Sequence, residues 1–149
     1  MNNGGFHHIG LVSDHAGYEL KHKIFELIKS RDSLHDYGVT SDSEPVDYPD
    51  QAKKIILGFD RGDIDGAICV CGSGLGMSMV ANRSPAIRAA VVWSKESAVL
   101  SRQHNDANVL CLGGRLLDHQ LALDMVLAWL STPFLGGRHQ RRVGQFNSR

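Results

Sequence analysis

A cysteine followed by a glycine-rich loop is the part of this sequence whose residue types are best suited to chemistry. Cys71 ends the apolar run Ala67–Cys71, and the segment Gly72-Ser73-Gly74-Leu75-Gly76 follows it directly. Glycines allow backbone N–H groups to approach a ligand closely, and N–H groups at a helix start favour an anion or a developing oxyanion. The same positive field stabilises a thiolate, so Cys71 is a candidate general base. The alternative interpretation is that Cys71 is a buried structural cysteine before a tight turn. The glycine-rich loop that follows it favours the interpretation as a general base.

The loop does not match the common nucleotide-binding motifs. The dinucleotide fingerprint G-x-G-x-x-G requires a glycine where Met77 stands, and it belongs to the first turn between a strand and a helix rather than to an internal strand. A P-loop requires Gly-Lys-Ser or Gly-Lys-Thr, which does not follow Cys71. These differences argue against a nucleotide or dinucleotide ligand.

A second candidate cluster, Asp14-His15-Ala16-Gly17, follows the apolar run Ile9–Val12. It places a carboxylate and an imidazole directly after a predicted strand. The alternative interpretation is that Asp14 caps a helix while His15 is merely exposed.

Two further clusters lie in the second half of the chain. In His104-Asn105-Asp106, His104 could act as an acid near neutral pH, or simply interact with the end of a helix. The basic cluster comprises Arg115, Arg138, His139, Arg141 and Arg142. If the C-terminal segment is helical, Arg138 and Arg142 share one face, as suits a phosphate dianion. The alternative is a solvated basic terminus.

The elements that must position these residues alternate between strands and helices. Short apolar runs predict strands at 9–12, 34–36, 67–71, 87–93 and 109–112, and helical periodicity predicts helices at about 18–30, 52–59, 75–81, 95–103 and 122–130. This order predicts an α/β fold, a single Rossmann-like three-layer α/β/α domain with a five-stranded, mostly parallel sheet. Ligands bind beyond the carboxyl ends of such strands, so we expect all four clusters at that edge.

The composition is that of a globular protein without an overall charge. The chain has 149 residues, of which 42% are hydrophobic, and its 16 basic residues balance 16 acidic ones. This balance gives no basic field for nucleic acid, and the sequence predicts neither a nucleic-acid nor a membrane partner. Residues 1–8 are polar and unlike a signal peptide, so we expect a flexible tail at 1–8 and one domain at 9–149.

Three cysteines without a regular framework indicate a reducing, cytoplasmic compartment. Cys69 and Cys71 form a C-x-C pair on a predicted strand, and strand alternation is expected to point their side chains to opposite faces. We therefore expect no metal site.

Five segments, taken in order, closely resemble the ribose-5-phosphate isomerase B family and its galactose-6-phosphate isomerase relatives. They are Ser13–Gly17, Asp47–Pro49, Cys71–Gly76, Ser101–Leu110 and Gly136–Gln140. Ser73 stands where the family often has Thr, which keeps the hydroxyl. Some relatives have Ser in place of Cys71 and use a nearby Glu, but this loop contains no Glu. A further departure is that the chain stops soon after Arg142, so a short C-terminal helix is expected.

The resemblance implies a homodimer, sometimes paired into a tetramer, with active sites that use residues from both chains. It implies that Cys71 accepts a proton, that His104 assists sugar-ring opening, and that Ser73 supports the reaction. The implied substrate contacts are Asp14, His15, Tyr48, Gly72, Ser73, Gly74, Leu75, Gly76, Asn105, Arg115, Arg138 and Arg142.

The implied activity is aldose–ketose isomerisation of ribose 5-phosphate and ribulose 5-phosphate, a reaction of the pentose phosphate pathway, through a cis-enediolate and without metal or organic cofactor. A hexose 6-phosphate of the allose or galactose type is the first alternative substrate. A non-catalytic module that binds phosphorylated sugars is the second alternative.

Overall fold

Five parallel strands form the sheet at the centre of the molecule, in the order β2-β1-β3-β5-β4. The computed structural model describes residues 5–31 and 33–148. The strands are β1 (Ile9–Ser13), β2 (Leu34–Asp36), β3 (Gly66–Cys71), β4 (Ala89–Val91) and β5 (Val109–Gly113). Every strand pairing is parallel, so the prediction of a five-stranded, mostly parallel sheet is confirmed.

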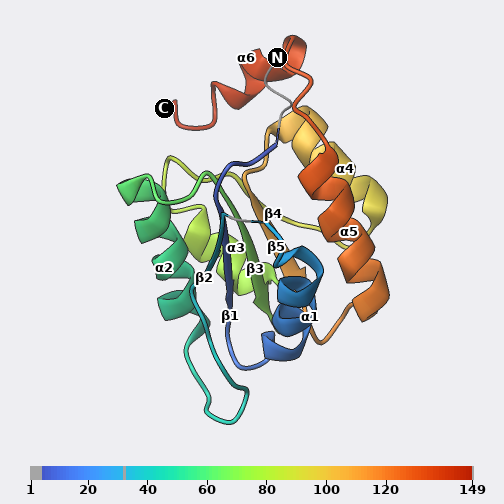
Figure 1. Cartoon of the computed structure of the whole chain (residues 1–149). Coiled ribbons are helices and arrows are strands. Elements are labelled where there is room, and N and C mark those ends of the chain that lie inside the picture. The colour runs from blue at the N-terminus through green and yellow to red at the C-terminus, as the bar shows by residue number, and fades with distance from the viewer. Residues whose placement is uncertain (1–4, 32, 149) are drawn as a thin grey trace.

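Helices cover both faces of this sheet, which confirms the three-layer prediction (Figure 1). They are α1 (Tyr18–Ile28), α2 (Tyr48–Arg61), α3 (Leu75–Ala81), α4 (Lys95–Asn105), α5 (His119–Ser131) and α6 (Arg138–Val143). One apolar cluster joins the sheet to α1, α4 and α5, and a second joins the other face to α2 and α3. Consecutive strand residues such as Cys69 and Val70 belong to different clusters, because successive side chains point to opposite faces.

Local sequence signals set several helix ends. Ser94 and Ser97 form a capping box at the start of α4, and Asp106 ends that helix with a left-handed φ of 48°. Gly62 ends α2 with a φ of 74°, and its N–H donates to the carbonyls of Gly58 and Phe59. The predicted strand at 87–93 is shorter in the structure, because β4 is an edge strand and the Arg88 N–H bonds to Asn108 Oδ1.

Residues 6–8, predicted as part of the flexible tail, make defined contacts. The Phe6 ring stacks on Trp129 with centroids 4.5 Å apart. The backbone N–H groups of His7 and His8 donate to the Asp65 carboxylate. These contacts place 6–8 on the surface of the domain rather than in a free tail, while residues 1–4 of that prediction lie outside the described residues.

Within residues 5–31 and 33–148, no helix combines the length and the apolar character needed to cross a bilayer.

Candidate active site

The carboxyl ends of β1, β3 and β5 meet around a cavity of about 330 Å³. The parallel register pairs Ser13 with Val70 and Cys71 with Gly113, so the loops that follow these strands begin at one level. The cavity is lined by Asp14, His15, Ala16, Tyr48, Cys71, Gly72, Ser73, Gly76 and Arg115. The structure thus brings together two of the four predicted clusters, with Arg115 from the basic cluster.

The Cys71 thiol lies at the floor of this cavity and is 4% exposed. The Gly74 N–H donates a hydrogen bond to its Sγ, with an N···S distance of 3.1 Å. Gly74 has a φ of 81°, and a Cβ there would lie 3.1 Å from the carbonyl carbon of Leu112. A glycine therefore lets the loop return to the sulfur, and its N–H stabilises negative charge there.

Ser73 is placed so that its hydroxyl can donate. The Leu75 N–H donates to Ser73 Oγ at 3.2 Å, so the hydroxyl proton of Ser73 is left for another acceptor. The side chain of Leu75 itself does not line this cavity. It lines an adjacent apolar hollow of about 300 Å³ together with Trp93 and Leu116, so the prediction that Leu75 contacts substrate has no side-chain support in this chain.

The prediction that Cys69 and Cys71 point to opposite faces is wrong. Both belong to the same apolar cluster as Cys111, because residues two apart on a strand share a face. A hydrogen bond with Cys69, followed by burial, raises the pKa of the Cys111 thiol well above its usual range. Across the described part of the chain, no three His, Cys, Asp or Glu side chains are grouped as a metal site.

A tight turn after β1 presents Asp14 and His15 to the cavity. Asp14 Oδ1 accepts from the Gly17 N–H at 2.9 Å, so Asp14 closes this turn and is not the N-cap of α1, which is Gly17. A Cβ on Gly17 would lie 2.3 Å from the Val70 carbonyl oxygen. Only glycine permits this close approach, which presses the turn against β3.

Tyr48 and Arg115 form the walls of the cavity. Tyr48 begins α2 and lies over Gly76, where a Cβ would come within 2.5 Å of Tyr48 Cε2. Arg115 lies beside Gly72, where a Cβ would be 3.6 Å from Arg115 Cδ. An exposed guanidinium at the mouth of the cavity suits an anionic group of a ligand.

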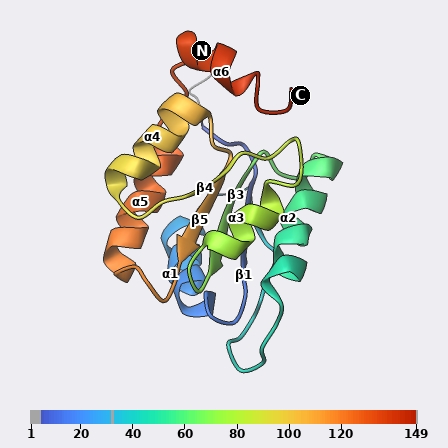
Figure 2. The same cartoon turned by 180° about the vertical axis from the view of Figure 1, so that it is seen from behind.

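The cluster at His104–Asp106 and the α6 members of the basic cluster lie at the opposite end of the sheet, so the prediction that all four clusters share the carboxyl edge holds for Arg115 but is wrong for these residues. His104 and Asn105 occupy the last turn of α4, just before β5 begins, and α6 packs beside them (Figures 1 and 2). A crossover helix returns the chain to the amino end of the next parallel strand, so its last turn belongs to the amino edge. At about 3.3 Å per residue, β5 alone puts about 13 Å between the two edges.

The amino-edge cluster is a compact group of cationic and imidazole side chains. His104 stacks on His139, with ring centroids 4.3 Å apart and planes 10° apart. Burial, followed by the positive charges of His104, Arg138 and Arg142, lowers the pKa of His139. Arg138 and Arg142 are exposed four residues apart on α6, so they share one helix face. Sequence reasoning missed the His104–His139 stack, because residues 35 apart gave no local signal of it.

Arg102 holds the last turn of α4 in place. Its guanidinium bonds to Asp106 Oδ1 at 2.8 Å and to the Ala107 carbonyl at 2.9 Å, and lies 4.6 Å from the centre of the Phe6 ring. The side chain of Arg102 is only 5% exposed. This anchor determines where His104 and Asn105 emerge at the surface.

Comparisons with known proteins point to one kind of enzyme. The family described as Ribose/Galactose Isomerase matches residues 9–146. Ribose-5-phosphate isomerase B of Escherichia coli is 46% identical over 136 residues, which cover 91% of this chain and 91% of that protein. A ribose-5-phosphate isomerase B structure from Clostridium thermocellum superposes with a TM-score of 0.88 at 47% identity, covering 92% of this chain and 93% of that one.

A third relative was solved with a ligand. Ribose-5-phosphate isomerase B of Mycoplasma genitalium, with bound ribulose 5-phosphate, superposes with a TM-score of 0.86 at 38% identity. The match covers 93% of this chain and 92% of that one.

Proposed function

Because the chain belongs to the ribose/galactose isomerase family, we propose that it interconverts ribose 5-phosphate and ribulose 5-phosphate. The observation that carries this proposal is the Cys71 thiol at the floor of a cavity, with a backbone N–H directed at its sulfur. The relative solved with ribulose 5-phosphate supports the choice of a pentose phosphate.

Cys71 acts as the base in this proposal. Its thiolate removes the proton from C2 of the open-chain aldose. The electron pair of that bond forms the C1=C2 double bond, and the carbonyl electrons move to the C1 oxygen, giving a cis-enediolate. A proton passes from the C2 hydroxyl to the C1 oxygen, and the Cys71 thiol returns its proton to C1. The Gly74 N–H lowers the cost of the thiolate, and the Ser73 hydroxyl donates to the developing charge.

The loop amides are not all available for the substrate oxygen. The Gly74 N–H is directed at Sγ and the Leu75 N–H at Ser73 Oγ. Side-chain donors on the cavity wall would therefore add to the loop amides that remain available to the enediolate.

A second copy of the chain completes the site in our proposal. His104 would assist ring opening, Asn105 would bind the sugar, and Arg138 and Arg142 would hold the phosphate, but all four lie at the far edge of the sheet from Cys71. The carboxyl edge also exposes apolar side chains that a partner would cover: Trp93, which follows β4, and Leu116, which follows β5, are 67% and 73% exposed. A homodimer in which each cavity faces the other chain's α4 and α6 satisfies both observations.

The test is isomerisation of ribose 5-phosphate by the purified chain, followed as ketose formation, with and without EDTA. We expect turnover that survives EDTA and falls by about a thousandfold in Cys71→Ala, as for loss of a general base. Cys111→Ala is the matched control, because Cys111 is buried in the same cluster but does not line the cavity. Near-normal turnover by Cys71→Ala would refute the assignment of Cys71 as the base.

Absence of turnover by folded wild-type protein would refute the pentose assignment. Turnover of allose 6-phosphate or galactose 6-phosphate would then identify a hexose phosphate isomerase. Binding of either sugar type without turnover would identify a non-catalytic module.

A further inference from the structure

We infer that His15 acts in the cavity as a neutral hydrogen-bond donor from Nε2, and that the backbone N–H of Val46 fixes it in this tautomer. The inference rests on the proposed isomerase function and assigns to His15 a specific task within it. It makes Val46 a positioning residue, although its side chain takes no part in the chemistry.

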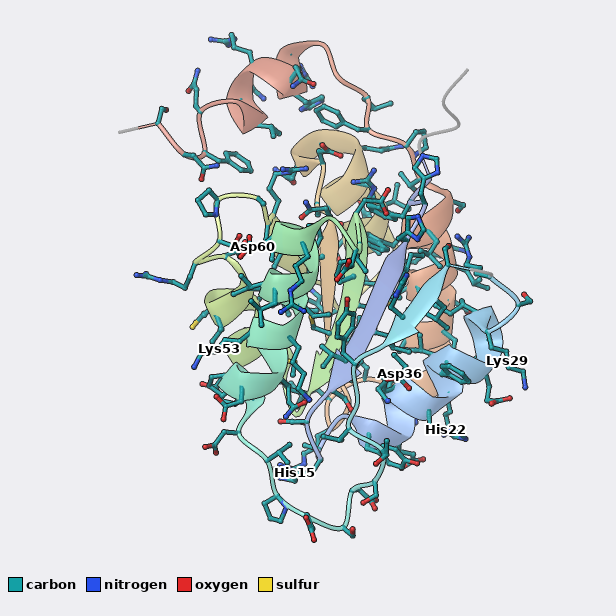
Figure 3. The ribbon with its side chains drawn as sticks, turned by 60° about the vertical axis from the view of Figure 1, so that its left-hand side comes forward. His15, His22, Lys29, Asp36, Lys53 and Asp60 are labelled. Atoms are coloured by element: carbon teal, nitrogen blue, oxygen red, sulfur yellow. The ribbon has the colours of Figure 1, made fainter. Side chains whose placement is uncertain are left out.

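The first step of the argument is that His15 is held in one place. The turn that carries it is closed by the bond from Gly17 to Asp14 and is pressed against β3 at Gly17. Figure 3 shows His15 at the end of β1, where the loop between β2 and α2 comes back towards the sheet. That loop brings Val46 to the imidazole from 31 residues away.

The second step is the direction of the hydrogen bond. The Val46 backbone nitrogen lies 3.2 Å from His15 Nδ1. A backbone amide can only donate, so Nδ1 must be the acceptor and carries no proton. In a neutral imidazole the single proton is then on Nε2.

The third step is what Nε2 faces. Across residues 5–31 and 33–148, no protein acceptor bonds to His15 Nε2, and the side chain lines the cavity with Cys71 and Arg115. The Nε2–H is therefore available to an oxygen of a bound sugar. Because Nε2 already holds the proton and Nδ1 is engaged, His15 is not arranged to be the base, which leaves that task to Cys71.

The fourth step is the need for such a donor. Gly74 and Leu75 direct their amides at Cys71 and Ser73, so part of the loop is occupied within the protein. A neutral imidazole that donates to the oxygen of a forming enediolate strengthens its hydrogen bond as charge develops, without transferring its proton. The chain that fixes the imidazole also leads directly into Tyr48 at the start of α2, so one segment positions two walls of the cavity.

The tautomer can be measured without substrate. In two-bond ¹H–¹⁵N spectra of the folded chain at about pH 8, where imidazoles are mostly neutral, we expect His15 to show a protonated Nε2 and an unprotonated Nδ1. The His15 signals are assigned by their loss in His15→Gln. A proton on Nδ1 would overturn the inference, whatever the activity of the chain.

Variants then test the link to catalysis. Val46→Pro removes the N–H, and we expect a kcat about fivefold lower, the worth of one neutral hydrogen bond, with KM changed less than about twofold. Glu44→Pro is the matched control, because it places a proline in the same exposed loop at an N–H that bonds to no described residue. Val46→Ala keeps the N–H and is expected to keep the tautomer signal.

A second pair of variants tests the position of the donor. His15→Gln offers an amide N–H near the Nε2 position and His15→Asn offers one near Nδ1, so we expect His15→Gln to retain at least about fivefold more kcat. Equal kcat in these two variants, or in Val46→Pro and Glu44→Pro, would overturn the inference. A wild-type chain without isomerase turnover would instead contradict the proposed function, while the spectra would still decide the tautomer.

Discussion

Two inactive variants of this chain should restore each other's activity if each site is shared between two copies. The first variant is Cys71→Ala, which disables the carboxyl edge of the sheet. The second carries both His104→Ala and Arg138→Ala, which disables the amino edge. These edges lie about 13 Å or more apart along β5, so a single chain cannot bring both sets of side chains to one sugar phosphate.

The size of the recovery follows from the symmetry of a dimer. When equal amounts of the two variants exchange at random, about half of the dimers contain one copy of each. One site in such a dimer carries both defects and the other carries none, so about one quarter of the wild-type activity should return. The assay is ketose formation from ribose 5-phosphate after the two proteins are unfolded and refolded together, with mixed dimers counted by native mass spectrometry.

The control is a mixture of Cys71→Ala with Arg115→Ala. Both residues line the same cavity, so every site in their mixed dimer keeps one defect and no recovery is expected. Mixed dimers of the first pair that form but stay inactive would refute the shared site.

Three further perturbations test local features of the structure. Gly76→Ala places a Cβ 2.5 Å from Tyr48 Cε2, so the ring must leave the cavity wall, and we expect a KM several-fold higher with little change in melting temperature. Arg102→Ala removes a buried cation that bonds to Asp106 and to backbone carbonyls, and should lower the free energy of unfolding by about 3 kcal/mol in urea titrations. Burial and neighbouring positive charges lower the pKa of His139, so the unfolded chain binds its proton more readily. Stability should therefore fall as pH drops through about 6.5 towards the lower folded pKa, and His139→Gln should flatten this dependence, measured as unfolding free energy against pH. The first prediction is contradicted if the KM of Gly76→Ala is unchanged. The second is contradicted if the unfolding free energy of Arg102→Ala lies within about 0.5 kcal/mol of wild type, and the third if His139→Gln has the pH profile of wild type.

The local signals in the sequence were sufficient for most of the elements and for the two clusters that line the cavity. Apolar runs that are buried on both faces are typical of parallel strands, and the run that ends at Cys71 is the clearest of them. The glycines after Cys71 indicated backbone N–H groups that can approach an anion closely, and in the structure Gly74, with a left-handed φ of 81°, directs its N–H at the Cys71 sulfur. Such features depend on neighbouring residues, whose types restrict the backbone directly.

The arrangement of the clusters around the sheet was decided only in part by the tertiary structure. His104 follows a helix rather than a strand, and the crossover carries it to the amino edge, away from Cys71. The sequence left open whether the basic segment 138–143 is helical, and only its packing against α4 brings His139 onto His104. For His104 the predicted order is sufficient, because a helix at 95–103 that leads into a parallel strand at 109–112 must end at the amino edge, and the expectation of a carboxyl-edge position overlooks this. For His139 the order of elements specifies no edge, because no strand follows α6.

What the sequence determined by itself was the alternation of strands and helices, the loop after Cys71 and the resemblance to one family of isomerases. Each of these is encoded in residues close together in the chain, or in motifs that keep their order along it. Only the tertiary structure decided that Phe6 packs on Trp129, that the Val46 N–H reaches His15 Nδ1, and that α6 packs beside the end of α4 at the amino edge. Those contacts join segments far apart in the sequence, and their geometry follows from strand register and helix packing, which no single segment specifies.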